Sequence, residues 1–198
     1  MAEKRPSSIG GDSPAPGGPS DTTGRAIVVG LGNPVLGDDG VGWRVADEVE
    51  RLLGQAAVSD GLMLGVKVEV ERLGVGGLRL MEYLTGYETA ILVDAAEFPN
   101  RPAGEVRTCL LEDLAGNVAG HLDSAHDASL GTALALGRKL GASLPARIHV
   151  VTVQARSTDE FGEELSPEVA AAVPVAAQAV VSLLAAGGVA CFGLGLPI

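Results

Sequence analysis

Two adjacent carboxylates, Asp38 and Asp39, are the residues best placed to do chemistry, because they lie in an unusually glycine-rich segment. The segment, residues 30–42, reads GLGNPVLGDDGVG. An apolar run at 26–29 precedes it, and a helical pattern of apolar residues follows it from Val41. This order predicts a strand, a glycine loop and a helix, with both carboxylates at the start of the helix.

A phosphate-binding loop is the first interpretation, since Gly30-x-Gly32 follows a strand as in dinucleotide-binding motifs. The third glycine of such a motif would fall at position 35, which is Val35. A pyrophosphate needs the positive field of a helix start, and Asp38 and Asp39 would repel it there. The charges therefore disfavour a nucleotide-binding module.

A structural interpretation makes Asp38 a helix cap and lets Asp39 interact favourably with the helix dipole. It explains one carboxylate well and two less well. It does not explain why Gly37, Gly40 and Gly42 crowd around them, an arrangement that leaves a carboxylate accessible to something large.

A metal site is the third interpretation. Asp94 ends a buried strand at 89–93, and His126 precedes a helical pattern. In a parallel sheet, Asp39, Asp94 and His126 can converge at the carboxyl edge. Two carboxylates and an imidazole suit a divalent transition metal and leave coordination positions open. Structural alternatives stay open: Asp94 can bond a loop backbone, and His126 can be a helix cap or a buried imidazole.

The remaining histidines and the cysteines are weaker candidates. His149 is expected within a strand, and His121 in a polar loop. Cys109 and Cys191 lie far apart without metal-binding spacing, and neither has charged neighbours that would lower a thiol pKa. A disulfide scaffold is not indicated, so a reducing cytosol is expected.

Strands and helices are expected to alternate along the chain. The expected strands are 25–31, 66–73, 89–93, 104–111 and 147–155, and the expected helices are 39–53, 78–84, 127–140 and the segment from Ser166. The first helix should stop near Gly54, and Pro174 should kink or split the last one. The alternation predicts a single α/β domain with a mostly parallel sheet and helices on both faces.

The chain of 198 residues has 14 basic and 25 acidic side chains, a net charge of −11, which disfavours nucleic-acid binding. Residues 1–24 are rich in Ser, Gly and Pro and are expected to be disordered. The uncharged stretch 169–198 is dominated by Ala and Gly and interrupted by Pro174. A buried helix followed by an apolar tail at 187–198 is therefore expected in preference to a membrane anchor.

Four segments resemble the nickel-iron hydrogenase maturation proteases over about residues 25–186. They are GLGNPVLGDDGVG at 30–42, ILVDA at 91–95, SAH at 124–126 and LSPEV at 165–169, in the family's order. The first motif is quite specific, and the other three gain weight from their order. The chain departs from the family in having Asp39 where some members have Glu, and Asp127 directly after His126.

The resemblance implies a three-layer fold, with a twisted five-stranded sheet between helices over residues 25–186. It implies an aspartyl-type endopeptidase that removes the C-terminal extension of a hydrogenase large-subunit precursor after nickel insertion. By position in the motifs, Asp39, Asp94 and His126 are its catalytic and metal-binding residues. The nickel is expected to be carried by the substrate, and other divalent ions such as cadmium are expected to fit the same ligands.

A non-cleaving nickel-sensing protein or chaperone on the same fold is the alternative from another functional class, because it would keep the three ligands. A cytoplasmic location is expected for either function. No coiled-coil signal suggests assembly, so a monomer is expected.

Overall fold

Strands and helices alternate through the described part of the chain. The computed structural model describes residues 24–59, 66–113 and 127–186. The elements are β1 (Gly24–Leu31), a 3-10 turn η1 (Gly37–Gly40), α1 (Val41–Ser59), β2 (Val66–Leu73), α2 (Gly77–Leu84), β3 (Thr89–Ala96), β4 (Val106–Leu110), α4 (Asp127–Lys139), β5 (Arg147–Gln154) and α5 (Pro167–Ala186). The expectations for residues 1–23 and for the 187–198 tail lie outside the described residues.

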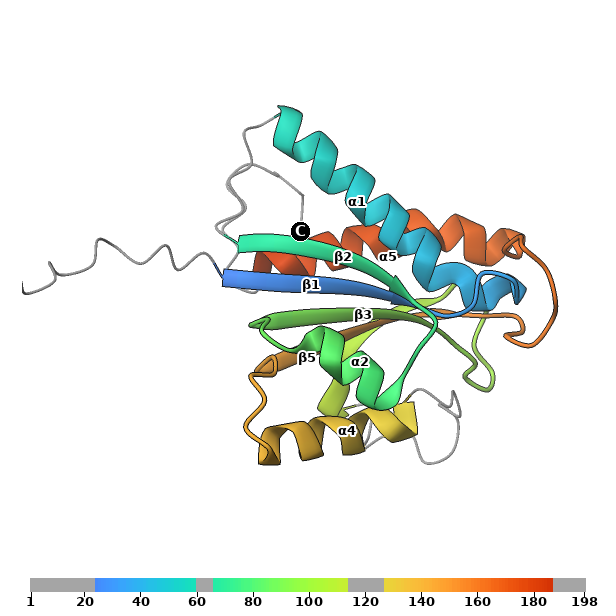
Figure 1. Ribbon diagram of the computed structural model, residues 1–198. Helices are drawn as coiled ribbons and strands as arrows, with labels where there is room; N and C mark the ends of the chain where they lie inside the picture. Colours follow the sequence, from blue (N-terminus) through green and yellow to red (C-terminus); the bar gives the residue numbers. More distant parts are fainter. Residues whose placement is uncertain (1–23, 60–65, 114–126, 187–198) are drawn as a thin grey trace, which may run out of the picture.

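The five strands form one sheet in the order β2-β1-β3-β5-β4 (Figure 1). All neighbouring strands are parallel except β4, which runs antiparallel to β5 at the edge. In the parallel part, the carboxyl ends of β1 and β3 lie side by side, because Gly30 is in register with Val93. The predicted α/β class and mostly parallel sheet are confirmed.

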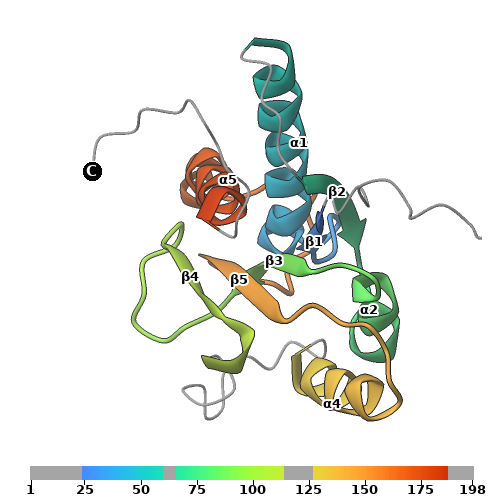
Figure 2. The same ribbon diagram turned by 90° about the vertical axis from the view of Figure 1, so that its left-hand side faces the viewer.

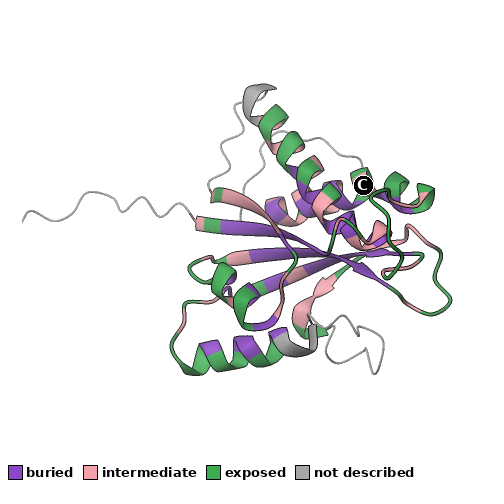
Figure 3. Cartoon of the chain, turned by 45° about the vertical axis from the view of Figure 1, so that its right-hand side comes forward, coloured by how far each residue is buried: buried purple, intermediate pink, exposed green. Residues whose placement is uncertain are grey.

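Helices cover both faces of the sheet: α1 and α5 pack together on one face, and α2 and α4 on the other (Figure 2). Neighbouring residues of a central strand therefore serve different cores. Val28 and Ile91 belong to the core with α1 and α5, and Ile27 and Leu92 to the core with α2 and α4. This explains why β1 and β3 are apolar almost without interruption and buried over most of their length (Figure 3).

Helix α1 does not stop near Gly54, and that prediction is wrong. The helix continues to Ser59, so residues 55–59 are helical instead of the expected loop. A glycine inside a helix costs about 1 kcal/mol. Helix α1 can bear this cost because Val45 and Val49 on its inner face are fully buried in the core.

Two other boundaries also differ. Strand β3 continues past Asp94 to Ala96, because Ala95 and Ala96 pair with β5. Helix α5 runs unbroken through Pro174, so of the two expected outcomes, a kink or a split, the split is wrong. Proline removes one helical hydrogen bond, but the helix is held along its length by packing against α1, β4 and β5.

Helix α5 is also the one described helix long and apolar enough to cross a membrane by length and composition. Its inner face is part of the domain core, with Val169, Ala176 and Val180 fully buried. This packing agrees with the expectation of a buried helix.

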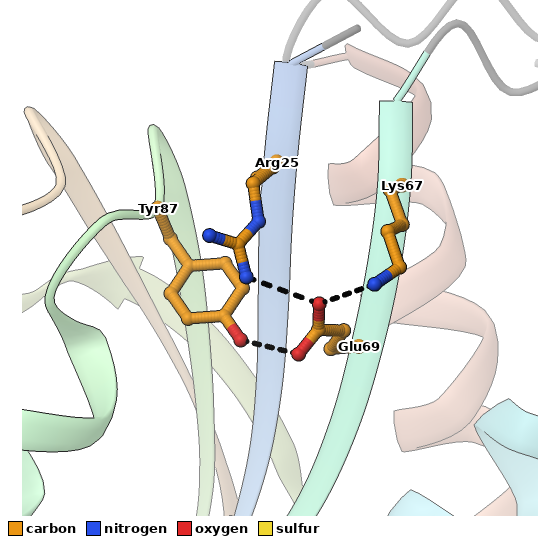
Figure 4. A network of polar contacts seen from close by, with 4 residues as sticks. All are labelled: Arg25, Lys67, Glu69 and Tyr87. Atoms are coloured by element: carbon orange, nitrogen blue, oxygen red, sulfur yellow. Dashed lines mark hydrogen bonds and ion pairs between the residues drawn. The ribbon is translucent and has the colours of Figure 1, made fainter.

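Glu69 of β2 links the amino-terminal halves of β2 and β1 to Tyr87, which lies just before β3 (Figure 4). Its carboxylate accepts hydrogen bonds from the Tyr87 hydroxyl at 2.5 Å, Lys67 at 2.9 Å and Arg25 at 3.1 Å. The Arg25 guanidinium also stacks 4.5 Å from the centre of the Tyr87 ring. These hydrogen bonds, that of Tyr87 most strongly, lower the pKa of Glu69 to about 2.

The depressed pKa predicts a pH-dependent effect of Glu69→Gln. The unfolded-state pKa of a glutamate is about 4.3, so the charged carboxylate stabilises the fold fully above that pH and loses this effect as the pH falls through about 2. Glu69→Gln should therefore lower the free energy of unfolding at neutral pH, with a deficit that shrinks below about pH 4.3. Urea unfolding at a series of pH values measures the deficit.

Glu82→Gln is the matched control, since Glu82 is exposed on α2 and has no ion pair among the described residues. Its effect should not vary with pH. A Glu69→Gln deficit that is equally large at about pH 3 and about pH 7 would contradict the assigned cause.

Candidate functional site

The glycines of the 30–42 motif allow the start of α1 to touch the backbone of two strands. A Cβ atom on Gly42 would overlap the carbonyl oxygen of Leu31 and lie 2.6 Å from that of Val93. A Cβ on Gly30 would collide with the Gly42 carbonyl. A Cβ on Gly32, whose φ is +121°, would likewise collide with the carbonyl of Asp39. The motif therefore packs backbone on backbone at the carboxyl edge of β1 and β3.

Asp39 lies in η1 at this edge and is partly buried. Its Oδ2 accepts a hydrogen bond of 2.6 Å from the Asn33 backbone N–H. The Asn33 side chain in turn accepts from the N–H of Val35 at 3.2 Å, a local turn that holds the loop in shape. The sequence analysis singled out Asp39 but not Asn33 as a residue that positions it. The position of Asn33, a turn-forming residue type between Gly32 and Pro34, could have indicated this role.

Asp94 lies in β3 at the same edge and is 6% exposed. It follows Val93, whose carbonyl approaches Gly42, and it is in register with Thr152 of β5. The start of α1 thus brings the segments that carry Asp39 and Asp94 to the same end of β1 and β3, as the metal interpretation requires.

His126, the third predicted ligand, lies outside the described residues. Helix α4 begins directly after it, at Asp127. Within residues 24–59, 66–113 and 127–186, no group of three His, Cys, Asp or Glu side chains is arranged to hold a metal ion. The ligand set of Asp39, Asp94 and His126 therefore stays a prediction.

Asp38, the neighbour of Asp39, has a different role from the predicted cap of its own helix. It is 5% exposed, and η1 has no side-chain cap. Its carboxylate accepts hydrogen bonds from the backbone N–H groups of Arg156 (2.9 Å) and Ser166 (2.6 Å) and from the Ser166 hydroxyl (2.9 Å). Asp38 therefore joins the motif to both ends of the loop between β5 and α5.

Ser166 precedes α5, and its carbonyl accepts the N–H of Ala170 at 2.8 Å, as expected of the residue that caps this helix. The residue pairing with Asp38 lies 128 positions further along the chain. No local pattern in the sequence identifies such a partner.

The remaining candidates have little reactivity. Burial, and secondarily the charge of Asp113, raises the pKa of Cys109 and so keeps the thiol protonated. Burial, and secondarily Arg147, lowers the pKa of His149 on β5. His121 and Cys191 lie outside the described residues.

Comparison with known proteins assigns the chain to a family. The family model described as "Hydrogenase maturation protease" matches residues 44–183, most of the chain. The chain belongs to the hydrogenase maturation protease family. The match includes Asp94 and begins five positions after Asp39. The protein is therefore a peptidase of hydrogenase maturation, and C-terminal processing of a hydrogenase large subunit fits that membership.

Three relatives of this protease have names that refer to hydrogenase formation or maturation. The hydrogenase expression/formation protein HupD of Rhodobacter capsulatus is 28% identical over 165 residues, covering 83% of this chain and 73% of HupD. The [NiFe] hydrogenase maturation protease HybD of Thermococcus kodakarensis has a TM-score of 0.59 at 27% identity, with 81% and 99% of the two chains covered. The hydrogenase maturating endopeptidase HybD of E. coli shares the fold, with a TM-score of 0.68 at 24% identity over 83% and 94% of the chains.

The crowded backbone at Gly42 predicts that Gly42→Ala destabilises the protease by about 1–3 kcal/mol, as overpacking does. The matched control is Gly54→Ala in the same helix, where an added Cβ has no atom within 4 Å. That change should stabilise by about 1 kcal/mol through helix propensity. Urea unfolding measures both, and equal effects of the two substitutions would contradict the close approach.

The contacts of Asp38 predict that Asp38→Ala lowers the free energy of unfolding by about 2–4 kcal/mol, because two backbone N–H groups lose their acceptor. Asp39→Asn is the control, since its amide oxygen can still accept from Asn33 and its loss should stay below about 1 kcal/mol. Thermal unfolding of the three proteins tests this, and an Asp38→Ala variant as stable as the wild type would refute a structural role.

Proposed function

We propose that this protease removes the C-terminal extension of a nickel-iron hydrogenase large-subunit precursor once nickel has been inserted, and that it recognises the nickel carried by that substrate. The observation that supports this most directly is the location of Asp39 and Asp94 at one edge of the sheet. His126, which precedes α4, is proposed as the third ligand.

The proposed donor set is compatible with a metal that belongs to the substrate. Two carboxylates and one imidazole leave coordination positions open on a divalent transition metal. The precursor can fill these positions with its own ligands. The metal would then be bound by the precursor and the protease together, so that only a nickel-loaded precursor would bind in this way. A metal ion there would also polarise the scissile carbonyl or activate a water molecule.

The protein's own residues would act mainly by positioning. The backbone N–H of Asn33 donates to the carboxylate of Asp39 and orients it. The buried Asp38 holds the loop between β5 and α5 by accepting hydrogen bonds from both of its ends. The expected cytoplasmic location and monomeric state remain predictions that accompany this proposal.

The test is to incubate the protease with nickel-loaded and nickel-free precursor and to weigh the products by mass spectrometry. Loss of a C-terminal peptide from the loaded form alone is expected. Asp39→Asn, Asp94→Asn and His126→Ala should each lower kcat/KM by at least about 100-fold, the upper end of the effect of outer-shell residues.

Glu48→Gln is the control, because Glu48 is a surface residue of α1 paired with Arg51, and it should leave cleavage unchanged. Equal cleavage of loaded and nickel-free precursor would refute the reading of nickel. A precursor that binds but stays intact would favour the chaperone alternative.

A further inference from the structure

Two exposed apolar residues, Val35 and Phe161, lie on neighbouring segments beside the candidate site and are together called the Val35–Phe161 patch. Phe161 is 90% exposed and Val35 is 46% exposed. The two segments are joined by a parallel β-bridge between Leu36 and Gly162, so the register puts Phe161 next to Val35. Hydrogen bonds from Gly162 N–H to Val35 O (3.1 Å) and from Gly37 N–H to Gly162 O (2.6 Å) close this bridge.

The loop that carries Phe161, residues 155–166, is held from three sides. Asp38 binds both of its ends. Glu97, just after β3, accepts hydrogen bonds of 2.7 Å from the N–H and the hydroxyl of Thr158. Arg44 of α1 donates to the carbonyl of Glu163 at 3.2 Å. A large aromatic side chain is thus exposed on a firmly attached loop, which lowers the entropic cost of binding a partner.

The patch is continuous with the proposed catalytic edge. Val35 is linked to Asn33 by a hydrogen bond, and Asn33 is linked to Asp39. The N–H of Asp39 also donates to the carbonyl of Leu36 at 3.1 Å. Val35 therefore belongs to the same loop as Asp39, and Phe161 to the segment bridged to that loop, so a chain bound at Asp39 can extend over both residues.

The charge around the patch defines the partner. The loop at 155–166 contains four carboxylates, at Asp159, Glu160, Glu163 and Glu164, and one basic residue, Arg156, which pairs with Glu168 of α5. All four are exposed, and no Lys, Arg or His among the described residues forms an ion pair with them. Such a rim attracts positive charge and repels an acidic surface.

We propose that the Val35–Phe161 patch and its acidic rim dock a segment of the hydrogenase precursor that carries an apolar side chain next to Lys or Arg. This inference rests on the proposed function and adds a recognition surface beside the site. Phe161 anchors the segment by apolar burial, and the carboxylates select its charge and speed its approach.

Steady-state cleavage of nickel-loaded precursor tests this. Phe161→Ser should raise KM about tenfold, the size of a moderate hot spot, while kcat stays within about twofold, as for the loss of uniform binding. The triple variant Glu160→Gln, Glu163→Gln, Glu164→Gln should also raise KM and should weaken its dependence on salt. Because Phe161 is so exposed, its substitution should not change the unfolding temperature.

Leu140→Ser and Glu82→Gln are the matched controls, since Leu140 is 77% exposed beyond α4 and Glu82 is exposed on α2. Both should leave KM unchanged. An unaltered KM in Phe161→Ser would overturn the docking surface. Absence of any cleavage by the wild type would instead refute the proposed function. In that event, direct binding of the uncut precursor to wild type and to Phe161→Ser still decides the docking proposal, with equal affinities overturning it.

Discussion

The close backbone contact between the start of α1 and the ends of β1 and β3 is the constraint on which the rest of the structure depends. Gly42 lies where any side chain would strike the carbonyl oxygens of Leu31 and Val93. Because no side chain separates the two backbones, this contact holds the start of α1 directly against the strand ends. It also brings Asp39 and Asp94 to the same edge of the sheet. Asp39 lies in η1 just before Gly42, and Asp94 follows Val93, which Gly42 contacts.

The two neighbouring aspartates illustrate how burial separates roles that the sequence leaves alike. Asp38 is almost fully buried, and its carboxylate accepts three hydrogen bonds from protein donors. These hydrogen bonds offset the free-energy cost of removing a charge from water. Asp39 is less buried, and a backbone N–H orients it. One acid therefore maintains the loop, and the other is the acid for which a ligand-binding role is proposed.

The loop between β5 and α5 connects these roles. It lies more than a hundred residues after the 30–42 motif in the sequence. Its hydrogen bonds with Asp38, Glu97 and Gly37 nevertheless make it part of the same edge of the sheet. The edge is thus assembled from the 30–42 motif, the end of β3 and this loop. Membership in a family of maturation proteases gives the assembly its chemical context.

Much of the fold was predictable from the sequence because its signals are local. Strands covered on both faces must be apolar throughout, and β1 and β3 are. The glycine motif likewise predicted a strand, a turn and a helix with Asp38 and Asp39 at the helix start, and the end of the apolar run at 89–93 indicated Asp94. The ends of α1 and β3 were not predictable, and the sequence left open whether Pro174 splits α5, because packing against neighbouring elements outweighs weak local preferences.

The sequence by itself determined the α/β class, the family resemblance and the residue types of the candidate site. Only the tertiary structure decided that Asp38 binds Ser166 rather than capping its own helix, and that Phe161 lies beside Val35. Both relationships join residues more than a hundred positions apart. Spacing along a chain carries no record of such pairs, since they arise from the way the sheet brings its strand ends together.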